Sequence, residues 1–314
     1  MAGRVIVGAG AVGTAVARLL AERGERVRIV SRSGRGPEHP LVERVGADAA
    51  DADRLVGLAA GATVLYNCAN PLYHRWLTDW PPLAAALLTA AERSGAVLAS
   101  VSNLYGYGVV DGPITDSTPL AATHPKLRLR ADMWREALDA HRAGRIRVTE
   151  VRGSDYLEAN SILTYSIGAP LLAGRRAFVP APLDVPHSWT SVADVARTLV
   201  AVADDPRGPG RAWLVPTGPP LTVRQLAVRF AGVAGASPPK LTPIPYPVIW
   251  LTGLFSPLVR ELRATRYQFA RPFVLDSGRT TAEFGITPSP LDEVLRRTAD
   301  NLRGSPTAVD RDDG

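Results

Sequence analysis

Three glycines near the start of the chain have the spacing of a phosphate-binding turn. The segment Gly8-Ala9-Gly10-Ala11-Val12-Gly13 has the pattern GxGxxG and lies between a short apolar run and a helical pattern. Gly8 would allow a tight turn, Gly10 the approach of a diphosphate to the backbone, and Gly13 close packing of the helix. The N–H groups of the helix start, at Ala11 and Val12, would face the anion. The pattern predicts a dinucleotide site, and the plainer alternative is a structural turn.

The residues after the second apolar run bear on which dinucleotide would bind. NAD sites usually place an acidic residue there for the ribose hydroxyls, whereas this chain has Ser31 and Arg32. Arginine and serine bind a 2′-phosphate, so NADP is favoured over NAD, and the alternative is that Arg32 is a solvated loop charge. Asp48 follows the third strand, where it borders an adenine ring or is an ordinary turn residue.

The pattern of apolar residues shows which elements would position this turn. Short apolar runs at residues 5–7, 27–30, 63–68, 96–101 and 146–151 alternate with amphipathic helical patterns. This alternation predicts an α/β fold, a Rossmann-type doubly wound parallel sheet. The predicted helices are one at residues 12–20, one capped by Asp51, one opened by Pro81 or Pro82 and running to about Ser94, and one at 126–142 with Leu127, Ala131, Trp134 and Leu138 on one side.

The regular alternation of apolar runs and helical patterns ends after Arg152, where prolines become common. We therefore expect residues 1–155 to form the dinucleotide-binding Rossmann domain, with 186–205 returning to it. Residues 156–303 would form a smaller C-terminal α/β substrate-binding portion, with helices near 160–172, 222–233 and 291–302. Residues 304–314 are polar and predicted to be a disordered tail.

Several further segments carry a family resemblance. They are Asn67-Cys68-Ala69-Asn70-Pro71, Ser100-Val101-Ser102-Asn103-Leu104-Tyr105-Gly106, Val151-Arg152-Gly153-Ser154-Asp155-Tyr156 and Thr190-Ser191-Val192-Ala193-Asp194-Val195-Ala196. With the glycine turn, they resemble the extended short-chain dehydrogenase/reductase family of sugar-nucleotide epimerases and dehydratases over about residues 4–204. The resemblance implies that Ala69, Asn70 and Gly153 lie along the cofactor.

The family's catalytic tyrosine and lysine, spaced as YxxxK, are replaced in this chain. The matching positions hold Lys126 and Arg130, and the position of the family's serine or threonine holds Val101, with Ser102 beside it. The like charge of Arg130 would favour the neutral amine of Lys126, which could then exchange a proton or polarise a carbonyl. The alternative is that Lys126 and Arg130 only hold ribose hydroxyls or phosphate.

In that alternative the proton source lies elsewhere. Candidates at strand ends and loops are Tyr105, Tyr107, Tyr156 and His187, each with a packing or hydrogen-bonding role as its alternative. Ser102, with Asn103, would orient a substrate oxygen.

The leading functional hypothesis is an NADP-dependent oxidoreductase of the atypical extended class. It would reduce a carbonyl or activated double bond of a small apolar metabolite. Apolar residues that would line its pocket, or else form ordinary core, are Trp134, Val248, Ile249, Trp250, Leu251, Leu254, Phe255 and Tyr267. The alternatives are an NAD(P)-dependent isomerase, epimerase, lyase or cyclase without net redox, and a non-catalytic NADP-sensing regulatory protein.

Composition excludes several other classes. The one cysteine, Cys68, and the absence of a signal pattern lead us to expect a cytoplasmic protein, and no metal-ligand spacing is visible. The net charge of +6 is spread without basic blocks, so nucleic-acid binding is not expected. The uncharged stretch 241–259 is broken by four prolines, so we expect a buried or substrate-facing loop and short helix rather than a membrane segment; a membrane-surface role is the less favoured alternative. The family resemblance implies a homodimer through helices near 83–93 and 126–142, with Trp134 and Leu138 compatible with the contact.

Overall fold

The structure is a computed structural model that describes residues 3–304. Contacts divide the chain into two units. Unit 1 is built from residues up to 154 with 192–216 and 275–287, and unit 2 from 155–191, 217–274 and 288 onward. The tail predicted for 304–314 lies outside the described residues, apart from Gly304 at the end of the last helix.

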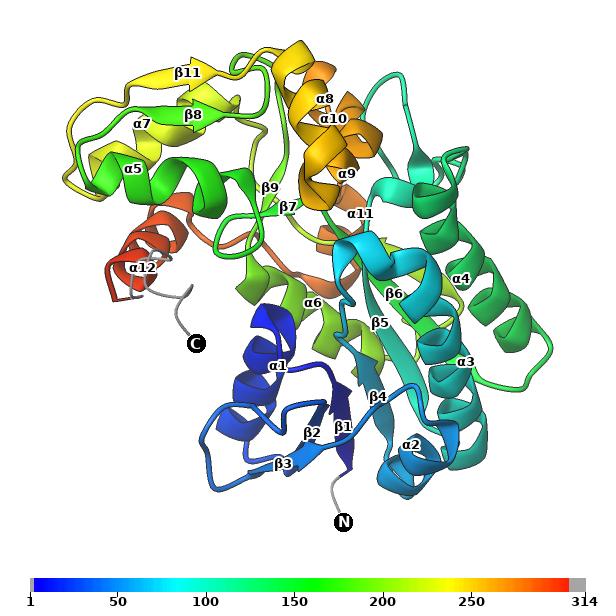
Figure 1. Ribbon diagram of the computed structural model, residues 1–314. Helices are drawn as coiled ribbons and strands as arrows, with labels where there is room; N and C mark the ends of the chain where they lie inside the picture. The colour runs from blue at the N-terminus through cyan, green and yellow to red at the C-terminus, as the bar shows by residue number, and fades with distance from the viewer. Residues whose placement is uncertain (1–2, 305–314) are drawn as a thin grey trace. The chain divides into compact units, whose positions relative to one another are not determined.

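Unit 1 contains a seven-stranded sheet in the order β10-β6-β5-β4-β1-β2-β3, with every neighbouring pair parallel (Figure 1). The strands are β1 (Arg4–Val7), β2 (Val27–Ser31), β3 (Val42–Gly46), β4 (Val64–Asn67), β5 (Val97–Asn103), β6 (Arg147–Gly153) and β10 (Arg211–Leu214). The apolar runs of the first half form β1, β2, β4, β5 and β6, as predicted. Because both faces of a parallel sheet are covered, β1, β2, β4 and β5 are rich in apolar residues, whereas β6 also carries Thr149, Glu150 and Arg152.

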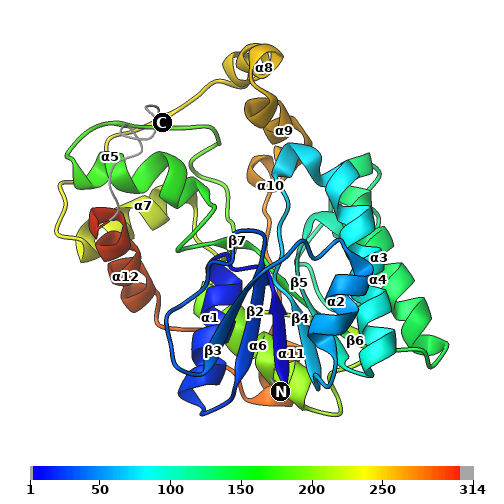
Figure 2. The ribbon, with the colours of Figure 1, turned by 60° about the horizontal axis from the view of Figure 1, so that its bottom comes forward.

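Helices cover both faces of this sheet. They are α1 (Ala11–Glu22), α2 (Ala52–Ala59), α3 (Trp76–Ser94), α4 (Pro125–Arg142), α6 (Val192–Asp204) and α11 (Gly278–Phe284), with the short 3-10 turns η1 (Tyr73–Arg75) and η2 (Tyr105–Tyr107). α1 and α6 pack together on one face, and α2, α3 and α4 lie side by side on the other (Figure 2). The later segments of the chain thus contribute β10, α6 and α11 to unit 1.

The helix α3 begins five residues earlier than predicted. We expected Pro81 or Pro82 to open it, but both lie inside it, and the helix begins at Trp76. Trp76 and Trp80, one turn apart, are both buried in the core, and Arg75 pairs with Asp79 across the same turn at 3.0 Å. Pro81 and Pro82 are the sixth and seventh residues of the helix and cannot donate to the carbonyls of Leu77 and Thr78, and the burial of two indole rings offsets this loss. The Asp51 cap of α2 is confirmed, since its carboxylate accepts from Arg54 N at 3.0 Å.

Unit 2 contains two small parallel sheets, β11-β8 and β7-β9, with helices around them. Its elements are β7 (Asp155–Tyr156), the π-helical η3 (Leu163–Ile167), α5 (Gly168–Leu172), β8 (Ala177–Val179), β9 (Trp189–Thr190), α7 (Val223–Val233), β11 (Leu241–Pro243), α8 (Tyr246–Phe255), α9 (Pro257–Thr265), α10 (Tyr267–Ala270) and α12 (Leu291–Gly304). Thr222 and Gln225 form the capping box that opens α7. The predicted fold class, a Rossmann-type sheet with a smaller C-terminal α/β portion, is confirmed.

Candidate functional site

The glycine turn after β1 has no room for larger residues at two of its three positions. Gly8 has φ +102°, and a Cβ there would lie 2.6 Å from the carbonyl oxygen of Cys68. A Cβ on Gly13 would lie 1.9 Å from the carbonyl oxygen of Gly8. Both contacts are with backbone atoms, so the tight path between β1, α1 and the loop after β4 requires glycine at both positions.

The third glycine faces open space. A Cβ on Gly10 would meet no atom within 4 Å, and Gly10 and Ala11 are exposed at the start of α1, while Val12 is buried. No side chain caps this end of the twelve-residue helix, and its first turn carries no acidic residue. The first-turn N–H groups and the positive end of the helix dipole therefore face an accessible space. These are the features of a diphosphate site, so the residues present fit a dinucleotide.

The end of β2 is a polar loop with cationic charge. Ser31 Oγ donates to the carbonyl of Arg35 at 3.0 Å, which closes the loop, and Arg32 is exposed. Partial burial works to raise the pKa of Asp79, but hydrogen bonds from Arg75 and Thr78 and the charge of Arg32 hold that pKa below its ordinary value. Arg32 therefore lies within electrostatic range of the start of α3.

The remaining cofactor candidates lie after the carboxyl ends of other strands. Asp48 is exposed after β3 and accepts from the N–H of Ala50 at 3.0 Å, as a turn residue does. After β4, Ala69 packs against Gly8 and Asn70 is exposed. Gly153 ends β6 and is buried. Since the strands are parallel, all these positions share the edge of the sheet that carries the glycine turn, which is where open α/β sheets bind ligands.

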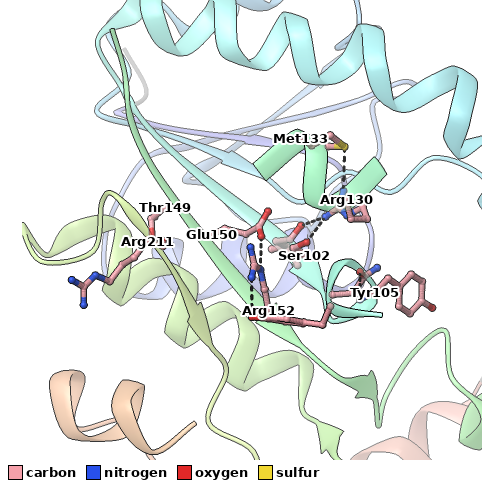
Figure 3. Close-up of polar contacts among 11 residues, drawn as sticks. Ser102, Tyr105, Arg130, Met133, Thr149, Glu150, Arg152 and Arg211 are labelled. Atoms are coloured by element: carbon pink, nitrogen blue, oxygen red, sulfur yellow. Dashed lines mark hydrogen bonds and ion pairs between the residues drawn. The ribbon is translucent and has the colours of Figure 1, made fainter. Parts of the chain in front are cut away.

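Arg130 joins α4 to the end of β5. Its Nη2 donates to Ser102 Oγ and to the carbonyl of Val101, both at 2.9 Å (Figure 3). The guanidinium carbon lies 4.5 Å from the ring centre of Trp80 and 5.8 Å from that of Trp76. Arg130 and Ser102 are both buried, so this bond ties the helix to the strand in a water-poor environment.

Lys126 lies one turn before Arg130 and is also buried, with 3% of its surface exposed. Its Nζ is 4.4 Å from the ring centre of Tyr73, so the ring face stabilises the ammonium. Tyr73, Trp76 and Tyr105 form an edge-to-face and tilted cluster with ring centres 4.8 to 6.2 Å apart. The structure thus brings Ser102, Tyr105, Lys126 and Arg130 into one aromatic region of unit 1.

A buried ion pair on β6 was missed by the sequence analysis. Arg152 Nε donates to Glu150 Oε1 at 2.7 Å, and Nη1 donates to the hydroxyl of Tyr107 at 2.8 Å (Figure 3). Burial raises the pKa of Tyr107 above its ordinary value, although the charge of Arg152 acts in the opposite direction. The signal was present, because charges two residues apart on a strand share one face. Tyr107 therefore serves as a hydrogen-bond acceptor inside unit 1.

Glu150 also lines a small, mostly apolar cavity of unit 1. Its volume is about 30 Å³, and its polar walls are Asn67, Ser100, Arg130 and Glu150. This is enough space for a water molecule. The cavity lies between the sheet and the helices α3 and α4.

The other two catalytic candidates belong to unit 2. His187 is 1% exposed, with Nε2 2.7 Å from Asp155 Oδ2 and Nδ1 3.1 Å from the carbonyl of Gln268. Its ring stacks on Phe269 at 4.5 Å. The carboxylate and the carbonyl hold the two ring nitrogens from opposite sides, so the orientation of the imidazole is fixed. Tyr156 is half-buried on β7, where it pairs with Thr190 of β9.

The structure contradicts the Trp134 dimer contact and the core alternative for most of the 241–259 stretch, whereas the pocket-wall alternative stays a prediction. Trp134 is buried in the core of unit 1, 5.5 Å from the guanidinium of Arg152, so it is not available for the proposed dimer contact, while Leu138 is half-buried. Of the residues expected to form core or pocket wall in the 241–259 stretch, only Ile249 is buried. The exposed ones are Val248, Trp250, Leu251, Leu254 and Phe255. They lie on α8, a helix that can form here because Pro247 is in its first turn and Pro257 comes after its end.

Solved structures resemble this chain over nearly its whole length. The WbmH enzyme of Bordetella bronchiseptica, in complex with NAD+, has a TM-score of 0.72 and 18% identity, covering 97% of this chain and 99% of that one. UDP-glucose 4-epimerase of Thermotoga maritima, with UDP-glucose, has a TM-score of 0.75 and 16% identity, covering 96% and 98%. DesIV, a dTDP-glucose 4,6-dehydratase of Streptomyces venezuelae with NAD bound, has a TM-score of 0.74 and 20% identity, covering 96% and 97%.

No protein-family model and no curated protein sequence matches the chain. The structural resemblance nonetheless extends over both units, and it includes the seven-stranded parallel sheet and the smaller C-terminal sheets. The likeness expected from the motifs is therefore confirmed for the fold: this chain has the fold of the extended NAD-dependent epimerase and dehydratase enzymes.

Proposed function

We propose that this chain is a nicotinamide-dinucleotide-dependent enzyme that rearranges a hydroxyl or carbonyl group without net consumption of its cofactor, as epimerases and dehydratases do. The observation that carries the proposal is the turn of Gly8, Gly10 and Gly13. Two glycines are sterically required there, and the third leaves the uncapped start of α1 open to a diphosphate. The nearly full-length likeness to enzymes solved with NAD supports this choice over net reduction, which was the leading hypothesis from the sequence.

For the cofactor we propose NADP, although the similar structures contain NAD. The residues from Ser31 to Pro37 at the end of β2 offer the guanidinium of Arg32 and the hydroxyl of Ser31, and none of them carries a carboxylate. A 2′-phosphate gains a charge-assisted hydrogen bond from such a loop, and an arginine also stacks on an adenine ring. We retain Asp48, Ala69, Asn70 and Gly153 as the other contacts of the dinucleotide.

For catalysis we propose a role for the buried region around Lys126. When bound, the nicotinamide would supply a carbon that accepts and returns hydride. The Lys126 ammonium would donate a hydrogen bond or proton to the substrate oxygen, since it stands where the family's tyrosine stands. Ser102 accepts from Arg130 and still has its own hydroxyl proton to donate to substrate. Arg130 would act as a positioning residue for Ser102, as well as a neighbour of the cofactor.

For the substrate class we propose a nucleotide-linked sugar, because one of the similar structures was solved with UDP-glucose. A small apolar carbonyl compound is the second candidate, and it is favoured by the aromatic surroundings of Lys126, which are Tyr73, Trp76 and Tyr105. The two candidates differ in stoichiometry, since a net reductase consumes one NADPH for each product.

The experiment is a turnover assay on the full chain. UDP- and dTDP-hexoses are incubated with NADP+ or NAD+, small ketones and enones with NADPH, and each mixture is followed by nicotinamide absorbance and by NMR. The proposal expects an epimerised or dehydrated sugar with no lasting change in absorbance. Stoichiometric oxidation of NADPH by a ketone would establish the reductase instead, and nucleotide binding without any product would favour a sensor.

A matched pair of lysine variants tests the catalytic role. Lys126→Met should lower kcat by about 100-fold or more, the usual range for a lost proton donor, with little change in nucleotide affinity. The chain's other lysine, Lys240, is exposed in unit 2, so Lys240→Met should leave kcat unchanged. Equal kcat values for the two variants would remove Lys126 from the reaction.

A further inference from the structure

The helix α8 of unit 2 exposes most of its apolar side chains. Phe255 is 89% exposed, Leu251 56% and Trp250 44%, and Val248 and Leu254 are similar. Only Ile249 and Gly253, one turn apart, are buried along this helix. Large apolar patches of this kind are uncommon on soluble surfaces and usually mark an interaction site.

The helix is held in place by a close contact with α9. A Cβ on Gly253 would lie 3.1 Å from the Cα of Arg260, so a larger residue there would push the two helix backbones apart by a few tenths of an ångström. Arg260 donates to the carbonyls of Gly253 and Leu254 at 3.0 and 3.2 Å, and Arg263 donates to the carbonyl of Trp250. Arg260 thus satisfies two of the last carbonyls of α8, Arg263 bonds to the middle of the helix, and together they hold α8 against α9.

The charges around the hairpin have one predominant sign. Between residues 240 and 271 the only acidic residue is Glu261, and the basic residues are Lys240, Arg260, Arg263, Arg266 and Arg271. Arg266 lies 4.1 Å from the ring centre of Tyr246, and Arg263 lies 4.7 Å from that of Trp250. Cations beside interfacial aromatic rings complement a surface of lipid phosphates.

From these observations we propose that the hairpin 246–265 binds the surface of bilayers that contain anionic lipids. At 100° per residue the exposed apolar side chains of α8 spread over roughly half of the helix circumference. A partner helix would cover a narrower stripe, whereas a fluid interface accepts side chains over the whole arc. Trp250, Leu251 and Phe255 would enter the acyl boundary while the arginines remain at the headgroups.

The length of the helix restricts the mode of binding. Ten residues span about 15 Å, half of the hydrocarbon thickness. Within residues 3–304, no helix has the length and hydropathy needed to cross a membrane. The hairpin would therefore lie in the interface, which revises our expectation from the sequence that the chain has no membrane partner.

The test is flotation of the full chain with vesicles. Vesicles of phosphatidylcholine with about one-third phosphatidylglycerol should carry the protein upward at low ionic strength, those of phosphatidylcholine alone should carry less, and salt should weaken the binding. Failure to float with the anionic vesicles overturns the proposal. The nucleotide-binding assay is independent of this result, so the two proposals can fail separately.

Variants assign the binding to the hairpin. A triple variant with Leu251→Ser, Leu254→Ser and Phe255→Ser should lose at least about 10-fold in vesicle partitioning, because three exposed apolar side chains are removed. Phe178→Ser, which removes a 58% exposed side chain on β8, is the matched control and should bind like the parent. Equal partitioning of parent and triple variant contradicts the proposal. A second result would also contradict it: the parent does not bind vesicles but forms a dimer, and the triple variant is a monomer. The apolar face of α8 would then be the contact surface for a second copy of the chain.

Discussion

Arg130 of α4 donates a hydrogen bond to the hydroxyl of Ser102 on β5, with 2.9 Å between Nη2 and Oγ. The two residues are 28 positions apart in the chain and both are buried. This bond joins the helix that carries Lys126 to the strand end that would face the nicotinamide, so it fixes the spacing between the two proposed catalytic side chains. It is also the most direct target for mutation.

Ser102→Ala should lower the free energy of unfolding by about 1–3 kcal/mol, because a buried guanidinium N–H loses one of its two acceptors. Urea unfolding followed by tryptophan fluorescence measures this, since Trp76 and Trp80 lie beside Arg130. Ser117→Ala, at an exposed serine, should change stability by less than about 0.5 kcal/mol. If both variants unfold at the same urea concentration, the bond contributes nothing to stability.

Substitutions at two glycines separate binding from folding. Gly10→Ala should weaken dinucleotide binding at least about 10-fold, because the methyl group occupies the approach of the diphosphate, and should cost less than about 1 kcal/mol of stability. Gly13→Ala should both weaken binding and lower the melting temperature, because its Cβ would overlap the carbonyl of Gly8. Calorimetric titration and thermal unfolding measure the two effects. Unchanged affinity in Gly10→Ala would show that the turn does not hold the nucleotide.

Arg32→Glu should invert the cofactor preference. Loss of one charge-assisted hydrogen bond to a 2′-phosphate, with a repelling carboxylate in its place, should weaken NADPH binding by about 10- to 100-fold and leave NADH binding nearly unchanged. Fluorescence titration of the reduced nucleotides at low salt measures both. Arg54→Glu makes the same charge change at an exposed position of α2 and is the control. If Arg32→Glu weakened the binding of NADPH and NADH by the same factor, this result would argue against NADP specificity.

Cys68 allows a chemical test of the glycine turn. It is buried directly beneath Gly8 and Gly13, with its Cβ 3.3 Å from where a Gly13 Cβ would be. Modification by Ellman's reagent therefore requires local opening of the turn, and a nucleotide bound to the turn should slow it by about 10-fold at saturation. An unchanged rate with saturating NADPH would place the nucleotide elsewhere.

Alkaline pH should destabilise unit 1 through the same residue. Burial raises the pKa of the Cys68 thiol above its ordinary value of 9.0, and burial likewise raises the pKa of Tyr66 above 10.0. The folded state therefore keeps both groups protonated while the unfolded chain ionises. The stabilising effect of Cys68 is lost as pH rises above 9 and that of Tyr66 as pH rises above 10, at about 1.4 kcal/mol per pH unit for each group. Urea midpoints of the parent and of Cys68→Ala should diverge in slope above pH 9, and identical slopes would contradict this account.

The sequence was sufficient to predict the repeating strands and the glycine turn because these depend on local patterns. In a chain in which strands and helices alternate, short apolar runs predict buried strands, and a GxGxxG motif between a strand and a helix predicts a phosphate-binding turn. The Asp51 cap and the Thr222 capping box were predictable for the same reason, since the interacting groups are three residues apart.

Features that depend on distant neighbours were not predictable. The spacing of Glu150 and Arg152 indicates that the two charges share one face of a strand, but their burial depends on Tyr107 and Trp134, which come from other elements. Trp134 looked suitable for a dimer contact until the position of Arg152 was known. The exposure of α8 also depends on tertiary packing, because its sequence is equally suited to a core.

The construction of unit 1 from three separate stretches of chain affects how the protein is made. The edge strand β10, the helix α6 that packs on α1, and α11 are all synthesised after residue 191, and the last of them ends at Phe284. An emerging chain would expose the β6 edge until β10 has been synthesised at Leu214, and unit 1 would stay incomplete until α11 has been synthesised at Phe284. Parallel pairings between such distant segments close slowly. We therefore expect the nascent chain to depend on chaperones and shortened chains that end before residue 216 to aggregate, which pulse-labelled translation would detect.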